Sequence, residues 1–243
     1  MFHGLGTVIN VATIAVGSSI GMFTGGKLSE RTKSLVTDIL GCITLLAAAD
    51  AVVSLWSPAF VHSVPHGWTL LGTLFALILG GALGTATKLQ DRLEGFGESL
   101  RQRFGGDERS FIAGFMAATL LFAIGPLAIL GGISDGMGTG ITQLVLKSTL
   151  DFFAAMAFAS TFGLGVVASI IPVAIYQGLW TMVGFFLGDV MVGYQVAAMN
   201  VAGGVLLFGI SLRLLGIKEI RIGDLLPAIF LAPLVALVAH QFI

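Results

Sequence analysis

The segment Phe122–Asp151, FAIGPLAILGGISDGMGTGITQLVLKSTLD, decides how the whole sequence is interpreted. It combines a Gly-Pro pair, a glycine-dense reversal and three ionisable residues, Asp135, Lys147 and Asp151, within otherwise apolar sequence. A charged side chain in the hydrocarbon of a membrane costs at least about 2.5 kcal/mol. These residues are therefore functional-site candidates, and the rest of the chain is interpreted as the structure that holds them.

The composition indicates a membrane protein. Of the 243 residues, 56% are hydrophobic and only 10% are charged, and the mean hydropathy is +0.99. An average soluble domain has about 25% charged residues. The net charge of −1 gives no basic field for nucleic acid. At roughly 20 residues per spanning helix, we expect a single transmembrane domain over residues 1–243.

The apolar runs predict an all-α, polytopic bundle of about eight spans. The N-terminal run has no preceding Lys or Arg, so it is interpreted as the first span rather than a signal peptide. A long uncharged run, from 152 to 188, exceeds one helix, and we divide it at Gly163-Leu164-Gly165. The predicted spans are residues 4–25, 35–56, 68–87, 111–134, 141–162, 166–188, 196–215 and 225–242.

The basic residues support eight spans and predict an orientation. The loops after spans 1, 3 and 7 hold eleven of the twelve Lys and Arg residues. Cytoplasmic loops are enriched in Lys and Arg, and these three loops share one face only if there are eight spans with both termini outside. Residues 88–110 then form a cytoplasmic loop, in which Leu93, Phe96, Leu100 and Phe104 predict an amphipathic helix on the membrane surface.

Small residues at four-residue spacing predict close helix packing. Gly17, Gly21 and Gly25 lie in span 1, and Gly80 and Gly84 lie in span 3. These faces are also compatible with self-association into a homodimer.

Spans 1–3 and 6–8 form a candidate inverted repeat. Span 2 resembles span 7, with Gly41 opposite Gly203. An offset of five spans places the two triplets upside down relative to each other, as in many secondary transporters. Apolar segments also resemble one another by chance, so both interpretations stay open.

Lys147 and Asp151 are the central candidates for chemistry. Lys147 lies about 9 Å into span 5, and Asp151 is one turn deeper on the same face. A surface pair at this spacing contributes only about 0.2 to 0.5 kcal/mol, which does not explain two charges at this depth. The pair is either a structural ion pair or a functional one. In the functional interpretation, a cation or proton displaces the Lys147 ammonium from Asp151 or Asp135, or the ammonium itself meets an anionic substrate.

Other groups extend the candidate site. Gly125-Pro126 predicts a kink or break in span 4, because proline removes a helical hydrogen bond, and a break would leave backbone groups lining a cavity. The intramembrane amides are interhelical hydrogen-bond partners or, as a set, ligating groups. The candidate substrate- or ion-binding residues are Asn10, Gly125, Pro126, Ser134, Asp135, Lys147, Ser148, Asp151, Gln177 and Asn200.

No enzyme, metal or cofactor signature is expected in this sequence. Gly17-Ser18-Ser19-Ile20-Gly21 formally matches G-x-S-x-G, but it lies within a span with no strand before it. The four histidines lie near loops and show no zinc-site spacing.

Four motifs, GPLAILGGISDG, LKSTLD, IPVAIYQG and LLGIKEIRIGDLLPAIF, resemble the bacterial integral-membrane family called domain of unknown function 554. The resemblance covers nearly the whole chain, including the N-terminal G-T-V-I-N. The family often has cysteine before Gly125-Pro126, whereas this sequence has Ala123-Ile124. A role of the family's cysteine thiol therefore does not carry over to this chain. The resemblance implies a multi-pass protein of the bacterial inner membrane and little about activity.

We therefore expect a transporter of a small solute or ion, with proton or cation coupling open. Lys147 and Asp151 would be the exchangeable pair, and Asp135 the outer carboxylate. A passive ion channel is the first alternative, which saturable exchange kinetics would argue against. A non-transporting membrane protein, either a lipid-modifying enzyme or a structural partner, is the second.

Overall fold

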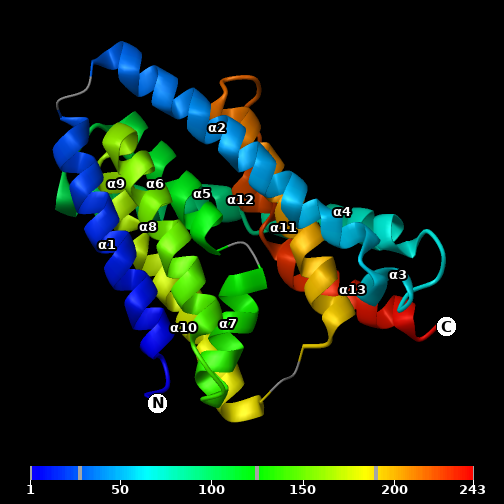
Figure 1. Ribbon diagram of the computed structural model, residues 1–243. Helices are drawn as coiled ribbons and strands as arrows, with labels where there is room; N and C mark the ends of the chain where they lie inside the picture. Colours follow the sequence, from blue (N-terminus) through cyan, green and yellow to red (C-terminus); the bar gives the residue numbers. More distant parts are fainter. Residues whose placement is uncertain (1, 27–28, 124–125, 189–190, 243) are drawn as a thin grey trace. The chain divides into compact units, whose positions relative to one another are not determined.

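The computed structural model describes residues 2–26, 29–123, 126–188 and 191–242 (Figure 1). The described residues contain helices and no strands. The chain divides into two compact units. Unit 1 consists of Met1–Leu40 and Glu94–Val190, and unit 2 of Gly41–Leu93 and Met191–Ile243. That the two units act as one transmembrane domain stays a prediction.

The all-α polytopic architecture is confirmed. In the described part of the chain, 7 helices are long and apolar enough to cross a membrane, or up to 8 with the bent pair α6 (Glu108–Ala123) and α7 (Pro126–Met137). The two helices of this pair are bent by 59° relative to each other, at the place where the Gly-Pro pair predicts a break. The inverted repeat stays a prediction.

The helix bounds follow the predicted spans closely. The predicted amphipathic segment is a helix, α5 (Leu89–Phe104), and a short helix, α3 (Pro58–Val61), lies in the loop before span 3. The remaining elements are α1 (Leu5–Gly25), α2 (Glu30–Val53), η1 (Ser54–Trp56), α4 (Trp68–Ala86), α8 (Thr142–Phe162), α9 (Leu164–Ala168), α10 (Ile170–Leu187), α11 (Gly193–Leu214), α12 (Ile222–Leu225) and α13 (Pro227–His240).

In unit 1, α1 packs directly on the backbone of α8 (Figure 1). A Cβ atom added at any of three glycines of α1 would overlap a backbone carbonyl oxygen of α8, so only glycine permits this approach. Residue numbers rise together along the contact, so the two helices are parallel. The facing pairs are Gly17 with Phe152, Gly21 with Met156 and Gly25 with Ser160.

The direction of α10 confirms that the long uncharged run contains two helices. Thr7 contacts Thr181, and Asn10 contacts Gln177, so α1 and α10 are antiparallel. Because α8 is parallel to α1, α8 and α10 are antiparallel to each other. The chain reverses after Gly163, whose φ of 62° lies in the left-handed region that glycine adopts readily.

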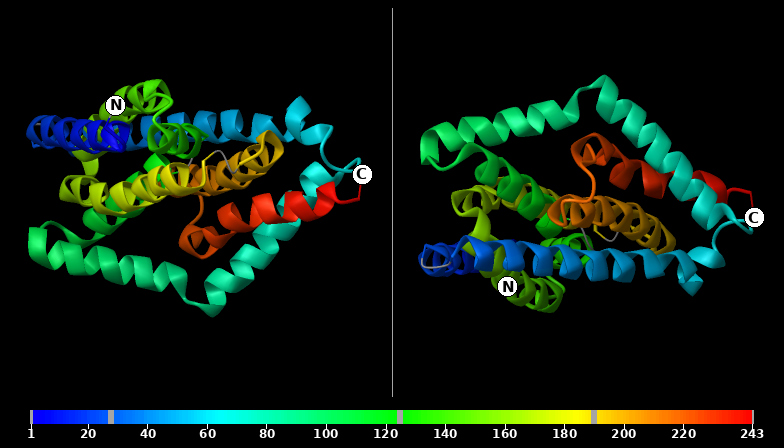
Figure 2. Two further views of the ribbon diagram at one scale, coloured as in Figure 1. Left: turned by 90° about the horizontal axis from the view of Figure 1, so that it is seen from below. Right: turned by 90° about the horizontal axis from the view of Figure 1, so that it is seen from above.

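In unit 2, α4 packs antiparallel against α12 and α13, and α4 runs alongside α13 in both views of Figure 2. Gly80 faces the backbone of Ala228, and Gly84 faces that of Asp224. The contact between α11 and the second half of α2 includes the Ser211 hydroxyl, which donates to the Gly41 carbonyl at 2.7 Å. The glycine faces of α1 and α4 are thus covered within their own units, so a homodimer would need another surface.

The packing of α1 on α8 generates a stability prediction. Gly21→Ala should destabilise the protein by about 1–3 kcal/mol, because the new methyl group overlaps the Met156 carbonyl and overpacking strains the contact. Thermal unfolding in detergent measures the change.

Gly178→Ala is the matched control, since a Cβ there meets nothing within 4 Å. Because alanine favours the helix more than glycine does, Gly178→Ala should leave the free energy of unfolding unchanged or raise it by up to about 1 kcal/mol. Equal melting temperatures for the two variants would contradict the proposed contact.

Candidate functional site

Four of the predicted site residues meet inside unit 1, and we call Asn10, Lys147, Asp151 and Gln177 the polar cluster. The Lys147 ammonium donates to the Asp151 carboxylate within α8. The Asn10 Nδ2 of α1 donates to the Gln177 Oε1 of α10 at 2.8 Å. The Asn10 side chain also interacts with the Asp151 carboxylate. The cluster therefore joins an ion pair to an amide pair across three helices.

The polar cluster is deeply buried. The exposed fractions are 0% for Asn10, 1% for Gln177, 5% for Lys147 and 8% for Asp151. Asp151 is the tenth residue of the 21-residue helix α8, which places it about 14 Å from the start of the helix. That is near the middle of a hydrocarbon layer of about 30 Å.

Two polar atoms of this cluster have no hydrogen-bond partner among the described residues. They are the Asn10 Oδ1, an acceptor, and the Gln177 Nε2, a donor. A buried polar atom left unsatisfied costs about 1–3 kcal/mol, so an arrangement that keeps two of them requires an explanation. A bound polar ligand would satisfy both.

Asp135 occupies a different position from the one expected for an outer carboxylate beside Lys147. The helix α7 continues through Asp135 to Met137, whereas the fourth span was predicted to end at residue 134. The Asp135 carboxylate accepts from the backbone N–H groups of Gly4, at 3.1 Å, and Thr7, at 3.3 Å. A carboxylate at a helix N-terminus is favourable, so Asp135 anchors the start of α1.

The two serines among the candidates make local hydrogen bonds. The Ser148 hydroxyl donates to the Leu144 carbonyl at 2.6 Å, one turn earlier in α8. The Ser134 carbonyl accepts from the Thr139 hydroxyl at 3.1 Å in the turn after α7. These contacts place Ser148 next to Lys147 along α8 but engage its hydroxyl within the helix.

The remaining candidates lie apart from the polar cluster or outside the described residues. Asn200 belongs to unit 2, where its Nδ2 donates to the Ser54 hydroxyl at 3.4 Å. Pro126 is the first residue of α7. Gly125 lies outside the described residues.

One contact of the site was missed in the sequence. The hydroxyls of Thr7 and Thr181 share a hydrogen bond of 3.1 Å, one turn along α1 and α10 from the amide pair. Thr7 precedes Asn10 by three residues, and Thr181 follows Gln177 by four. This spacing places Thr7 with Asn10 on one face of α1, and Gln177 with Thr181 on one face of α10. The sequence of either helix therefore indicates a polar face.

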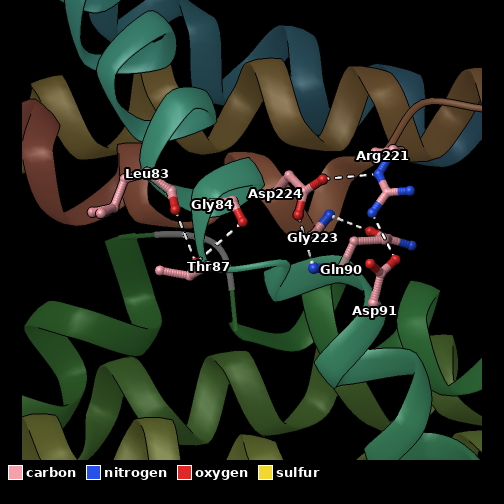
Figure 3. Close-up of polar contacts among 8 residues, drawn as sticks. All are labelled: Leu83, Gly84, Thr87, Gln90, Asp91, Arg221, Gly223 and Asp224. Atoms are coloured by element: carbon pink, nitrogen blue, oxygen red, sulfur yellow. Dashed lines mark hydrogen bonds and ion pairs between the residues drawn. The ribbon is translucent and has the colours of Figure 1, made fainter.

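A second polar junction, in unit 2, joins the start of α5 to α12 (Figure 3). The buried Asp224 carboxylate accepts from the Gln90 backbone N–H at 2.9 Å and from the Arg221 Nε at 2.8 Å. The Gln90 Oε1 accepts from the Gly223 N–H at 2.7 Å. The exposed side of Arg221 donates to Asp91 at 2.7 Å.

The junction is a permanently charged structural contact. Hydrogen bonds to Asp224 first, and then to Asp91, raise the pKa of Arg221 above its ordinary value. Asp224 satisfies a backbone donor at the start of α5 that the helix itself leaves unpaired. Sequence reasoning gave no weight to Gln90 or Asp224, because the two bonds that join Gln90 to the start of α12 span 133 and 134 residues.

Comparisons with known proteins give a family and no solved structure. The profile of the family described as "Protein of unknown function (DUF554)" matches residues 5–237. The chain is 29% identical over 237 residues to the "Uncharacterized membrane protein YdfK" of Bacillus subtilis (strain 168), covering 98% of this chain and 97% of the relative. It is 31% identical over 229 residues to the "Uncharacterized protein YqgA" of Escherichia coli (strain K12), covering 94% of each. No solved structure matches the chain.

The junction in unit 2 generates a stability prediction. Asp224→Ala should lower the melting temperature by several degrees, because it leaves the Gln90 N–H and one side of Arg221 without their acceptor. Asp91→Ala removes only the exposed partner of Arg221 and should have a much smaller effect. Thermal unfolding of the two purified variants compares them, and a larger loss in Asp91→Ala would contradict the assignment.

Proposed function

This chain belongs to the DUF554 family, and we propose that it is a membrane transporter of a small polar solute or ion. The observation that carries the proposal is the polar cluster of Asn10, Lys147, Asp151 and Gln177. It combines opposite charges with a donor and an acceptor that have no partner among the described residues, and all four side chains lie within membrane-length helices. A transported solute needs such groups away from both membrane surfaces.

A purely structural role explains the cluster less well. Replacing a buried ion pair by packed apolar residues is often neutral or stabilising, so stability gives little reason to keep Lys147 and Asp151 inside α8. Intramembrane ionisable residues commonly mark substrate and ion pathways. A static pair would also leave the Asn10 Oδ1 and the Gln177 Nε2 unsatisfied without compensation.

The bend between α6 and α7 supports the same proposal. Transporters commonly build their sites beside discontinuous helices. Within unit 1, the second half of this bent pair packs on α10 and α8, two of the three helices that supply the cluster. A change of the bend would therefore be transmitted to Gln177 and to the ion pair.

We also propose that the protein lies in the bacterial inner membrane with both termini outside. In unit 1, Gly165 packs on the Phe111 carbonyl and Gly25 packs on Ser160. The end of α1, the start of α6 and the junction between α8 and α9 therefore share one end of the unit. The basic residues Arg31, Lys33 and Arg109 flank this end, and positive residues favour the cytoplasmic side.

A periplasm-dependent phosphatase fused after residue 243 should be active, and an inactive fusion would contradict the orientation.

Water access to the polar cluster tests transport without knowledge of the substrate. We expect a cysteine at position 10, Asn10→Cys in a Cys42→Ser background, to react with a small, membrane-impermeant cationic thiol reagent. The reason is that a transport site must open to an aqueous phase during the cycle. Labelling of the protein in sealed vesicles, detected by mass spectrometry, measures the reaction.

Ala76→Cys in the same background is the control, because Ala76 is also 0% exposed but lies in the apolar core of unit 2. It should stay unlabelled. A protected Asn10→Cys would reject the transport proposal. Equal labelling of both variants would also reject it, since access would then not be specific to the cluster.

A further inference from the structure

The charge of the polar cluster limits the ligand that it can hold. Lys147 contributes one positive charge, Asp151 one negative charge, and the two amides none, while the neighbouring buried carboxylate of Asp135 is already held by two backbone N–H groups at the start of α1. A ligand with a net charge would leave an unbalanced charge at membrane depth, which is strongly unfavourable. The cluster therefore favours a polar ligand whose own net charge is zero.

Two side-chain atoms of the cluster, one donor and one acceptor, have no hydrogen-bond partner among the described residues. Gln177 Nε2 can donate and Asn10 Oδ1 can accept, and neither has a partner among the described residues. Flipping both amides together preserves their mutual hydrogen bond and again leaves one donor and one acceptor free. Lys147 adds further donors, and Asp151 adds further acceptors.

These groups match a ligand that carries both an ammonium and a carboxylate. Asp151 and Asn10 offer two acceptors for the ammonium, and Lys147 and Gln177 offer two donors for the carboxylate. The ligand would separate Lys147 from Asp151 and pair with each of them. One buried ion pair would be replaced by two, with no change in the buried net charge.

The packing around the cluster limits the ligand to a small size. Lys147 and Asp151 are four residues apart on one helix, a spacing of about 5–6 Å between Cβ atoms. Gly17 of α1 packs on the carbonyl of Phe152, the residue after Asp151, so α1 and α8 have little room to separate there. Ile14 and Leu144, both 0% exposed, fill neighbouring space.

We propose that the polar cluster binds a small zwitterion, an amino acid with a short side chain such as glycine or alanine. This assignment rests on the transport function proposed above and names the substrate class of the same site. Carboxylates without an ammonium, and ammonium ions without a carboxylate, would satisfy only half of the cluster.

Ligand-dependent thermal stability of the purified full-length protein tests the assignment. The probes are glycine, L-alanine, sodium acetate, methylammonium chloride and glycine betaine, each over the same concentration range at constant ionic strength. Glycine or alanine should raise the melting temperature saturably, because a ligand that binds only the folded state stabilises it. Acetate and methylammonium should give no saturable shift. Glycine betaine should bind at least tenfold more weakly than glycine, because its quaternary ammonium has no N–H to donate.

Variants assign the binding to this cluster. Gln177→Leu removes one donor without changing the charge and should weaken glycine binding at least tenfold, and Lys147→Met should abolish it. Thr73→Val in unit 2 is the control and should bind as the native protein does, because the Thr73 hydroxyl donates to the Thr69 carbonyl of its own helix and lies outside unit 1. If Lys147→Met does not fold, Gln177→Leu alone carries the comparison.

The possible results separate this assignment from the transport proposal. If acetate or methylammonium alone binds and Gln177→Leu weakens that binding, the zwitterion assignment is overturned and transport stands. The same holds if no probe binds while Asn10→Cys is labelled in vesicles. If no probe binds and Asn10→Cys is protected, both proposals fail. Glycine binding that survives both Gln177→Leu and Lys147→Met would place the site elsewhere and overturn the assignment.

Discussion

The ion pair between Lys147 and Asp151 is the interaction on which this account depends. An ammonium and a carboxylate inside a helix of membrane-spanning length must be neutralised, because neither hydrocarbon nor apolar side chains can solvate them. Each charge neutralises the other within α8, and Asn10 supplies an additional polar contact from α1. This mutual neutralisation lowers the free-energy cost of burying the two charges in the bundle. A ligand that pairs with both side chains would neutralise them in the same way.

Glycine packing places the other polar groups within reach of that pair. Three glycines of α1 lie against backbone carbonyls of α8, so the two helices approach closely and in parallel. Asn10 lies on the same buried side of α1 as these glycines. The antiparallel helix α10 then brings Gln177 to Asn10 and Thr181 to Thr7. The site therefore depends on backbone packing that larger residues at Gly17 or Gly21 would prevent.

The sequence predicted most of the helices because long apolar runs in a chain with 10% charged residues have few alternatives. It also identified the close-packing glycines and the break in span 4, since both follow from local residue properties. It identified Lys147 and Asp151 as partners because four-residue spacing in a helix is enough to place them together. Local information was sufficient for each of these features.

The sequence could not supply contacts that depend on which helices are neighbours. Asn10 and Gln177 are 167 residues apart, so their bond required the directions of α1 and α10. For the same reason Asp135 was expected beside Lys147, whereas it anchors the start of α1. The Asp224 junction with Gln90, 134 residues away, was missed on the same grounds.

The most direct test of the central claim is amino-acid uptake by proteoliposomes that contain the charge-exchanged double variant, Lys147→Asp with Asp151→Lys. The labelled solute is the amino acid that stabilises the native protein. The variant keeps a neutral pair and should fold with a melting temperature close to the native value. We predict that its uptake is lost, because the charges are reversed relative to Asn10 and Gln177. Uptake at the native rate would contradict the claim that this pair is the transport site.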